Sequence, residues 1–489
     1  MAVDFSKLRS LIHAKTPEMK APLPGGLNTL SGGFVVADTS KKHKGAFYIG
    51  GMSVIWRYFA DDDAYIQLPN SGALGVFGAG ACGAYRDLSA PGGVQTLTAT
   101  AGTTTSLTTA LTIDGAVIGA KVRAVAGPGA GYEGTVQNCT MGANAVLTVT
   151  PASGVAFTAA TQFQIFGGSL WYFNPGAAAV GFVVYDVITN AWTARSVVGL
   201  PTAWGTSGAL IATGGAESTG GGGFVNGTAS AGAASTLTDA TKTWPVNGWS
   251  NSQVRIKSGP GAGQVRLIAS NTATVLTVAV AWTTVPTAAS TYVIEGDDDT
   301  LHLGGNNAVT LYDYSISANT WATVTPAVAR AAGLGGGGAL DWIEEVPTWK
   351  EGQTGIYGNH YLTNILRQNG RYIYSFRGTA TNILDVYDIA ANTWINGVPY
   401  SGQMETFTTG SYTTNADGKI YISKEITNRI FKFDVAQNAM SGLFVSPMPQ
   451  GAVLAGDKMF IQTYEDVGTG RWLYAFGHTR SELIRFLLV

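Results

Sequence analysis

Charged residues are scarce in this sequence, because Asp, Glu, Lys and Arg make up only 12% of its 489 residues. Soluble domains usually contain about 25%. The 29 Lys and Arg residues and the 31 Asp and Glu residues nearly cancel, so the formal net charge is -2. This composition argues against binding of nucleic acid or of a membrane surface through bulk positive charge.

Cysteines and long apolar runs are also few. Cys82 and Cys139 have no metal-site spacing and are too few for a disulfide framework, so we expect two free thiols. No apolar run reaches the roughly 18 residues of a membrane-spanning helix, and the N-terminal residues lack a signal-peptide pattern. We therefore expect synthesis in a cytoplasm and no membrane-spanning segment.

Glycine, in contrast, is abundant, with 65 residues, and the hydrophobic fraction is 45%. The glycine share is roughly twice the average, yet there is no Gly-X-Y period and enough apolar material for a large core. At about 150 residues per domain, the length corresponds to roughly three units. These numbers predict an all-β, turn-rich protein.

Residues 1–44 are more basic than the rest of the chain, with a net charge of +4 against -6 for the remainder. Apolar residues at helical spacing predict a short amphipathic helix within Asp4–Lys20. One interpretation is an arm that holds a neighbouring subunit, and the other is a solvated leader. The basic residues of this arm are Lys7, Arg9, Lys15, Lys20, Lys41, Lys42 and Lys44.

A degenerate repeat runs through most of the remaining chain. In each copy an aromatic residue precedes a large residue by seven positions, and most copies have an Asn two positions before the large residue. This pattern predicts a strand, a tight turn in which Asn or Asp can take positive φ, and a second strand. The copies are Tyr58–Tyr65, Val184–Trp192, Asp313–Trp321, Val386–Trp394 and Lys432–Met440, and their anchors are Tyr58, Tyr185, Trp192, Tyr314, Trp321, Tyr387, Trp394 and Phe433.

Glycine pairs precede three of these copies, ending at Gly51, Gly168 and Gly305, and would let neighbouring strands approach closely. A glycine pair followed by a Tyr-Asp strand, an Asn turn and Trp resembles a blade of the Kelch type of β-propeller. The resemblance implies a propeller of about six blades. The C-terminal strand LIRFLLV is expected to close the ring by pairing with an N-terminal strand such as GGFVVAD.

Two insertions interrupt this propeller. The anchors Tyr58, Tyr185 and Tyr314 are 127 and 129 residues apart, whereas Tyr387 and Phe433 are only 46 apart. Each long interval therefore holds roughly 75 residues beyond a Kelch blade of about 50. The extra segments are copies of each other, because Lys121–Gly131 (KVRAVAGPGAG) matches Gln253–Gly263 (QVRIKSGPGAG). Alternating β-branched residues predict a small β-barrel or sandwich in each.

The second copy contains the stretches TLTDATKTW, VRIKSGPGAGQVR and IASNTATVLTV. These resemble a unit found in virion proteins of tailed phages, and a propeller with β inserts resembles the tail nozzle proteins of short-tailed phages. The expected order is a basic arm over 1–44, propeller segments over 45–92, 167–225 and 296–489, inserted β-domains over 93–166 and 226–295, and a long loop at 340–366.

Residues that could carry chemistry are dispersed. The five histidines have no ligand spacing, and His302 is expected to be a strand residue satisfied by its neighbours. The triplets Asp61–Asp63 and Asp297–Asp299 lack the pattern of a calcium loop and are interpreted as solvated turns. Aromatic residues between Leu340 and Leu366, including Trp342, could either stack on a ligand or cover a propeller face. No catalytic residue, cofactor or metal is assigned.

These observations favour a structural protein of a phage virion, in a tail nozzle or an adjacent tail ring, made in the host cytoplasm. It would assemble with copies of itself as a hexamer around the DNA exit path, contact other tail proteins and let DNA pass without specific binding. The alternative is a tail protein that binds a host receptor or carbohydrate. A third hypothesis, a propeller enzyme, has no catalytic constellation to support it.

Overall fold

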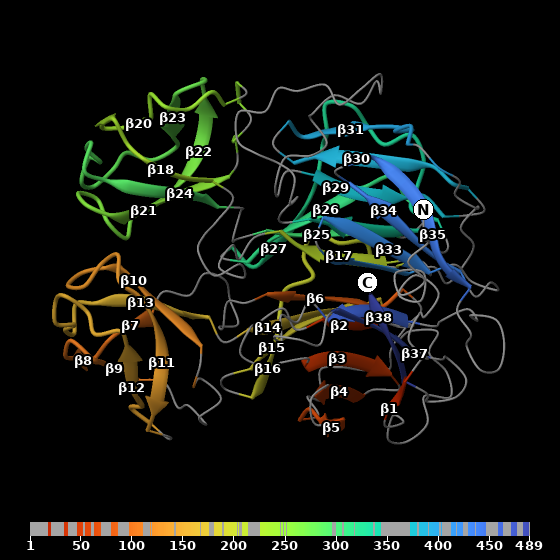
Figure 1. Cartoon of the computed structure of the whole chain (residues 1–489), viewed down its shortest axis with the longest axis horizontal. Helices are drawn as coiled ribbons and strands as arrows, with labels where there is room; N and C mark the ends of the chain where they lie inside the picture. The colour runs from red at the N-terminus through yellow and green to blue at the C-terminus, as the bar shows by residue number, and fades with distance from the viewer. Residues whose placement is uncertain are drawn as a thin grey trace, which may run out of the picture.

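In the computed structural model, the strands β1 to β38 form eight antiparallel β-sheets (Figure 1). No helix in the part it describes is long and apolar enough to cross a membrane. The structure describes residues 18–20, 34–37, 46–51, 54–59, 63–69, 80–86, 97–110, 118, 120–140, 143–166, 168–175, 180–187, 190–202, 204, 208–213, 225–244, 246–247, 249–250, 252–295, 300–305, 308–316, 318–335, 338–343, 372–378, 381–389, 391–400, 402, 412–416, 418–423, 429–435, 437–445, 458–462, 471–476 and 483–488.

Six of the sheets have four strands each and are called blades 1 to 6, with strands given from the innermost outwards. Blade 1 contains β2 (Val35–Ala37), β3 (Ala46–Gly51), β4 (Val54–Phe59) and β5 (Ala64–Gln67). Blade 2 contains β6 (Cys82–Arg86), β14 (Ser169–Asn174), β15 (Gly181–Asp186) and β16 (Ala191–Ala194). Blade 3 contains β17 (Gly208–Ala212), β25 (Thr300–Gly305), β26 (Leu311–Ser315) and β27 (Thr320–Thr323).

The remaining blades follow in chain order except for one strand. Blade 4 contains β28 (Ala339–Trp342), β29 (Tyr372–Phe376), β30 (Leu384–Asp388) and β31 (Thr393–Ile395). Blade 5 contains β32 (Tyr412–Ala416), β33 (Lys419–Ser423), β34 (Arg429–Asp434) and β35 (Ala439–Val445). Blade 6 contains β36 (Lys458–Gln462), β37 (Arg471–Phe476), β38 (Leu483–Leu488) and, on its outer edge, β1 (Glu18–Lys20).

The innermost strands of the blades contact one another in a closed cycle. β2 contacts β6, β6 contacts β17, and the cycle continues through β28, β32 and β36 back to β2. This is a β-propeller-like ring, which leaves no blade with an uncovered inner edge. Strands inside it are covered by a sheet on each side, and β14, β29 and β30 are accordingly buried along their full length.

Close approach of neighbouring blades requires glycine at the innermost strands. A Cβ at Gly208 of β17 would collide with the carbonyl oxygen of Gly80, directly before β6. A Cβ at Gly304 of β25, a member of one predicted glycine pair, would meet the side chain of Leu340 in β28 of the next blade. The prediction that glycine permits close packing of blades is confirmed at Gly304.

The ring is closed by an N-terminal strand, but not by the predicted one. The C-terminal strand β38 pairs with β1, with Met19 opposite Ile484. The segment GGFVVAD instead supplies β2, the innermost strand of blade 1, which pairs with β3. The predicted pairing of LIRFLLV with GGFVVAD is therefore wrong, because the free edge of β38 lies on the outside of the ring. The helix expected within Asp4–Lys20 is also wrong at its C-terminal end, since Glu18–Lys20 is a strand.

The two remaining sheets have seven strands each and follow the same order. Insert 1 contains β7 (Leu97–Thr98), β8 (Ala101–Gly102), β9 (Ser106–Thr108), β10 (Lys121–Ala126), β11 (Glu133–Cys139), β12 (Val146–Thr150) and β13 (Gln162–Phe166). Insert 2 contains β18 (Val225–Thr228), β19 (Ala231–Ala233), β20 (Thr236–Thr238), β21 (Gln253–Ser258), β22 (Val265–Asn271), β23 (Val275–Val278) and β24 (Thr291–Glu295).

Each insert is closed into a small barrel by its first segment. In insert 1, β7 pairs with β13 while β8, three residues further along the same segment, pairs with β9. Between them the amide of Ala99 donates to Thr161 O and the amide of Thr100 donates to Thr108 O. Insert 2 repeats this closure with Ala229 and Ser230. Both inserts have an apolar core of their own, around Val136 and Leu147 in insert 1 and around Trp249 and Ile268 in insert 2.

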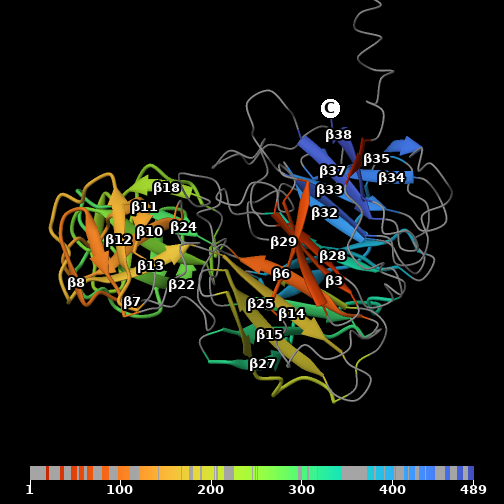
Figure 2. The same ribbon diagram turned by 90° about the horizontal axis from the view of Figure 1, so that it is seen from below.

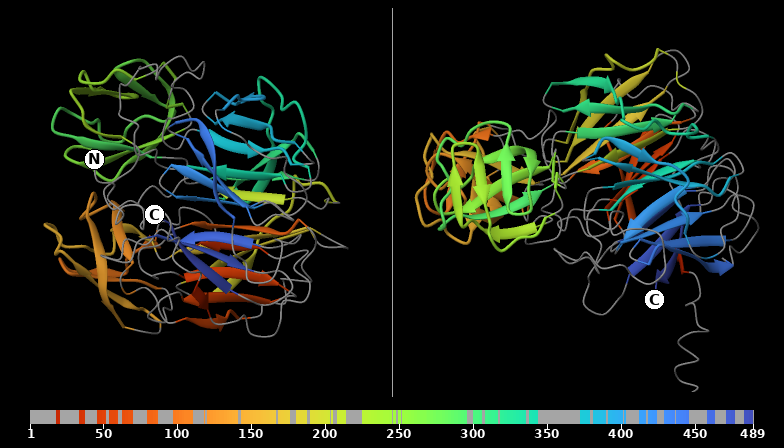
Figure 3. Two further views of the ribbon diagram at one scale, coloured as in Figure 1. Left: turned by 45° about the vertical axis from the view of Figure 1, so that its right-hand side comes forward. Right: turned by 90° about the horizontal axis from the view of Figure 1, so that it is seen from above.

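Both inserts interrupt the same connection in consecutive blades. Insert 1 lies between the first and second strands of blade 2, and insert 2 lies between the first and second strands of blade 3. Equivalent connections of adjacent blades emerge on the same side of the ring. The two inserts accordingly lie side by side at one side of the ring, as Figures 2 and 3 show from other directions.

Candidate assembly site

The repeated aromatic anchors lie in the two outer strands of blades 1 to 5. In every copy the aromatic residue and the large residue seven positions later are direct cross-strand partners. These pairs are Tyr58 with Tyr65, Tyr185 with Trp192, Tyr314 with Trp321, Tyr387 with Trp394, and Phe433 with Met440. In the four aromatic pairs the ring centroids are 4.8 to 5.2 Å apart. Pairs of this geometry stabilise a hairpin beyond the area that they bury.

A turn residue with positive φ joins the two strands of each pair. The five φ angles lie between +47° and +56°, at Asp63, Asn190, Asn319, Asn392 and Asn438. The prediction of Asn or Asp with positive φ is confirmed in all five hairpins, with Asp in the first and Asn in the other four.

The side chain of the turn residue also accepts a hydrogen bond from the tyrosine of the same hairpin. The hydroxyl of Tyr387 donates to Asn392 Oδ1 over 2.8 Å, and the tyrosines of blades 1, 2 and 3 make the same bond over 2.6 to 2.7 Å. Burial and nearby carboxylates raise the pKa of Tyr387, so its phenol stays protonated and available as a donor. Phe433 replaces the tyrosine in blade 5 and has no hydroxyl to contribute.

The same hairpins bind the exit segment of the preceding blade. Trp192 Nε1 of blade 2 donates to the carbonyl oxygen of Pro69 over 2.8 Å, and Trp321 Nε1 of blade 3 donates to Ser196 O over 3.0 Å. Blade 4 uses Asn392 Nδ2, which donates to Thr325 O, and blade 5 uses Asn438 Nδ2, which donates to Pro399 O. The repeat therefore joins the blades to one another as well as the strands within each blade.

A buried ion cluster adds a second link between blades 3 and 4. Asp385 in β30 is fully buried and accepts two hydrogen bonds from the guanidinium of Arg377, at 2.7 and 2.8 Å. Arg330, in the segment leaving blade 3, donates to the same carboxylate over 3.2 Å and to Ser375 Oγ over 2.5 Å. Burial opposes ionisation of Asp385, but the hydrogen bonds from Arg377 and Gly397 and the two positive charges outweigh it and lower its pKa.

His302 is a buried strand residue satisfied by its neighbours, as predicted. Its Nδ1 lies 2.6 Å from Asp313 Oδ1, and its Nε2 lies 2.9 Å from Thr213 Oγ1. The order of hydroxyl, imidazole and carboxylate is that of a hydrolase triad. Thr213 is only 4% exposed, however, so its hydroxyl is not accessible to a substrate. The three residues link the end of β17, after which Thr213 follows directly, to β25 and β26 of blade 3.

Several other predicted residues can be placed. Both cysteines are free, as predicted, with Cys82 buried and Cys139 half-buried. Asp63 is the turn residue of blade 1. Lys20 belongs to β1 and thus to blade 6, so this part of the predicted arm is a strand of the ring. The residues that lie outside the described ranges are Lys7, Arg9, Lys15, Lys41, Lys42, Lys44, Asp61, Asp62, Asp297, Asp298, Asp299 and the part of the 340–366 loop beyond Ile343.

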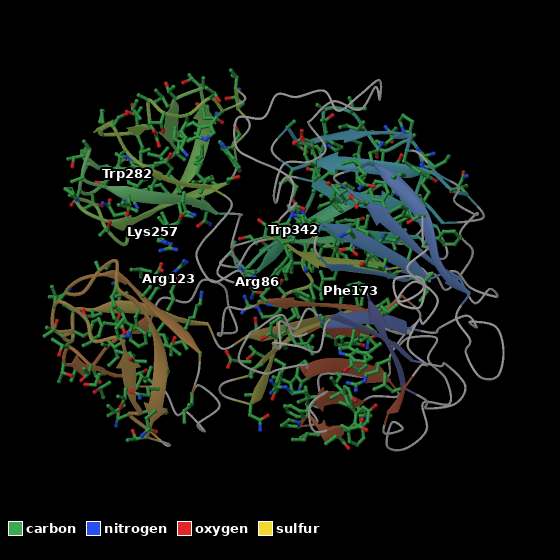
Figure 4. The ribbon with its side chains drawn as sticks, in the orientation of Figure 1. Arg86, Arg123, Phe173, Lys257, Trp282 and Trp342 are labelled. Carbon is green, nitrogen blue, oxygen red and sulfur yellow. The ribbon has the colours of Figure 1, made fainter. Side chains whose placement is uncertain are left out.

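Trp342 belongs to that loop by sequence, but the structure places it at the end of β28. Its side chain is half-buried and packs against the core of insert 2 and against the core between blades 3 and 4. Trp342 thus connects insert 2 to the ring, and Figure 4 shows where it lies in the ring. For this residue, the prediction of a covering aromatic is closer to the structure than the prediction of ligand stacking.

The two inserts also contact each other, which the sequence interpretation did not anticipate. Arg255 of insert 2, almost fully buried, forms an ion pair with Glu133 of insert 1. Next to this pair, the Gly-Pro-Gly-Ala-Gly hairpins of the two inserts meet through their glycines. Figure 4 shows Arg123 and Lys257 on the facing sides of the inserts. The available signal was that both copies keep this pentapeptide unchanged although the sequence around it differs.

Among the residues that the structure describes, no group of three or more His, Cys, Asp or Glu side chains could hold a metal ion. What these residues form instead is a set of contacts between repeated units: blade with blade, insert with insert, and insert with ring. Geometry of this kind holds surfaces in fixed relative positions. We therefore treat the inserts and the ring surface beside them as a candidate assembly site.

No protein-family model matches the chain, and no curated protein matches it. Among solved structures, the chain is similar to a chain of a crystal structure of the mitotic checkpoint complex, with 8% sequence identity and a TM-score of 0.35. That match covers 97% of this chain and 92% of the other.

Proposed function

We propose that this protein is a structural component of a phage virion, in the tail nozzle or an adjacent ring of the tail. The observation that carries the proposal is the duplicated insert. Its residues resemble a unit of tailed-phage virion proteins, and two copies of it stand side by side on one side of the ring. Duplicated, rigidly held β-barrels are suited to forming contacts with other subunits.

The ring supports this proposal as a rigid scaffold. Its blades are joined by hydrogen bonds from Trp192, Trp321, Asn392 and Asn438 and by the cluster at Asp385. As part of the same proposal, the ring is a six-bladed propeller of the Kelch type. The low share of charged residues, 12%, suits a surface that becomes interface, because interface cores are depleted in charge.

In the proposed mechanism the work is mechanical. Copies of the chain assemble around an axis as a hexamer, and the inserts project from the ring. The basic residues of the predicted arm other than Lys20, which belongs to β1, contact a neighbouring subunit or another tail protein. These residues are Lys7, Arg9, Lys15, Lys41, Lys42 and Lys44. The acidic excess of residues 45–489, with a net charge of -6, repels DNA and keeps it from adhering as it passes. No cofactor takes part.

The proposal is tested by quantitative mass spectrometry of phage particles purified through two density gradients. We expect the chain in several copies per particle, in constant ratio to the capsid protein. A non-structural phage enzyme present in the same lysate serves as the control for carry-over. Absence of the chain from purified particles, with abundant chain in the lysate, would refute the proposal. Binding of the purified chain to whole host cells or to a glycan array, without ring assembly, would favour a receptor-binding protein instead.

A further inference from the structure

The contact between the inserts is symmetric at the level of individual residues. Adding 132 to a residue number in the hairpin of insert 1 gives the equivalent residue of insert 2, so that Val125 corresponds to Lys257 and Gly131 to Gly263. A Cβ at Gly131 would lie 2.7 Å from the carbonyl oxygen of Lys257. A Cβ at Gly263 would collide with the carbonyl oxygen of Val125. Each glycine therefore meets the equivalent carbonyl of the other insert.

The alanine before each glycine repeats the pattern. The Cβ of Ala262 lies 3.0 Å from the position of a Cβ at Gly131, and the Cβ of Ala130 lies 3.2 Å from that of a Cβ at Gly263. Each contact therefore occurs twice with the roles of the two inserts exchanged: Gly131 meets the carbonyl of Lys257, and Gly263 meets the carbonyl of the equivalent Val125. Such reciprocity is the property of an isologous, two-fold interface. Here it relates two domains of one chain.

Glycine is required on both sides for two reasons. Gly131 and Gly263 have φ angles of +88° and +85°, which L side chains rarely adopt. The absence of a side chain also lets the Cα approach the opposite carbonyl, where Cα–H···O contacts contribute a fraction of a hydrogen bond each.

We infer that the Gly-Pro-Gly-Ala-Gly hairpin is a self-recognition element, by which one copy of the module docks on a second copy with two-fold symmetry. In this chain the two inserts satisfy each other and form one double module. The occupant that the face fits is thus another copy of the same face, whether from the same chain or from a second one. The inference concerns the module alone and does not depend on the proposed function of the protein.

The ion pair beside the hairpins breaks the symmetry in an informative way. Arg255 binds Glu133, whereas the equivalent Arg123 donates through its Nε to Gln164 Oε1 in its own insert, and the counterpart of Glu133 in insert 2 is Val265. Two-fold symmetry predicts that Val265→Glu places a carboxylate opposite Arg123. In a pair formed by two copies of insert 2, the same substitution would place one opposite Arg255 of each partner.

The test frees one face by removing insert 1. Arg86 and Ser169 are cross-strand partners, so the insert leaves and re-enters the blade at neighbouring positions and a short hairpin turn can replace it. With Cys82→Ala and Ala262→Cys, this chain is treated with a short bismaleimide. We expect covalent dimers linked through position 262, because the free insert 2 docks on insert 2 of a second chain. The full-length chain with the same two substitutions and Cys139→Ser is the control and should stay monomeric on a denaturing gel.

Two further variants of the shortened chain test whether the linked dimers form through the hairpin face. Gly263→Glu should lower the yield of linked dimer by about tenfold or more, which corresponds to at least about 1.4 kcal/mol. Val265→Glu should raise the yield above that of Val265→Gln. Absence of linked dimers, or dimers that Gly263→Glu leaves unchanged, would overturn the inference.

The full-length chain gives a second test if the shortened chain does not fold. By the two-fold relation, Val265→Glu should raise the unfolding temperature of the inserts above that of the matched Val265→Gln variant, through the new pair with Arg123. Equal unfolding temperatures would overturn the inference. In the background without native cysteines, Ala130→Cys and Ala262→Cys should be joined within one chain by the same reagent, and linkage only between chains would contradict it.

Discussion

The Asn turn of blade 4 allows the contribution of the repeat to stability to be separated into its parts. Asn392 has a φ angle of +47°, accepts a hydrogen bond from Tyr387 and donates one to Thr325 O of the preceding blade. Asn392→Asp keeps the acceptor and tolerates the backbone, as Asp63 does in blade 1, and loses only the donor. This substitution should lower the free energy of unfolding by about 1 kcal/mol.

The other two substitutions remove more. Asn392→Gly keeps the backbone conformation and loses both hydrogen bonds, at a cost of about 2 kcal/mol. Asn392→Ala also loses both hydrogen bonds, and it must place an L residue in the left-handed conformation, which costs about 1–2 kcal/mol more. The unfolded Ala variant has less conformational entropy than the unfolded Gly variant, which offsets part of this cost. Asn392→Ala should therefore lower the free energy of unfolding by about 1 kcal/mol more than Asn392→Gly does. Burial of the orphaned Tyr387 hydroxyl increases the cost of both variants.

Differential scanning calorimetry of the full-length chain measures the midpoint of the unfolding transition of the ring for each variant. The expected order of destabilisation is Ala, then Gly, then Asp. Asn144→Ala is the control, because Asn144 has a φ angle of +57° in an exposed turn of insert 1 and should affect the insert and not the ring. An Asn392→Ala variant that unfolds no earlier than Asn392→Asp would refute the reasoning.

The remaining predictions concern the joints of the ring. Asp385→Asn leaves Arg377 without its buried counter-ion and should cost about 3–5 kcal/mol, measured by calorimetry against the wild type. The pKa of Asp385 is lowered in the folded state, so its ionised form stabilises the fold above the ordinary value of 3.8, and this stabilisation is lost as the pH falls below it. The stability of the Asp385→Asn variant should therefore decrease less steeply with falling pH than that of the wild type. The same acid dependence in both proteins would contradict this. Gly208→Ala directs a methyl group at the carbonyl of Gly80 and should destabilise the ring by about 1–3 kcal/mol, with neutrality speaking against close contact of blades 2 and 3. Trp342→Ala should speed amide exchange in both insert 2 and blade 4, whereas an effect on blade 4 alone would show that this side chain does not hold the insert.

Features carried by local spacing could be predicted from the sequence. The seven-residue interval between Tyr387 and Trp394 places the two residues opposite each other across a hairpin, and Asn392 is suited to the positive φ of its turn. The duplication likewise indicated two modules, because equivalent segments, 129 to 132 residues apart, retain the same apolar pattern. These signals lie within one hairpin or one module and need no knowledge of the rest of the chain.

Contacts between distant segments could not be predicted in the same way. The strand β1 has only three residues, Glu18–Lys20, without an apolar alternation, and the free edge of β38 determines its position. The acceptors of Trp192 and Trp321 are backbone carbonyls, which any residue supplies. The sequence of each Gly-Pro-Gly-Ala-Gly hairpin predicts a turn. Nothing in one copy indicates that this turn contacts the turn of the other copy.

We propose that copies of this chain form a ring in the phage tail, with the inserts as fixed projections. Cryo-electron microscopy of purified particles tests it most directly, with a small tag fused after Val489 to identify the chain. We expect rotationally symmetric tail density in which each subunit shows a β-propeller-like ring with two contacting barrels on one side. Tagged density outside the tail, or a subunit whose two barrels stand apart, would contradict it.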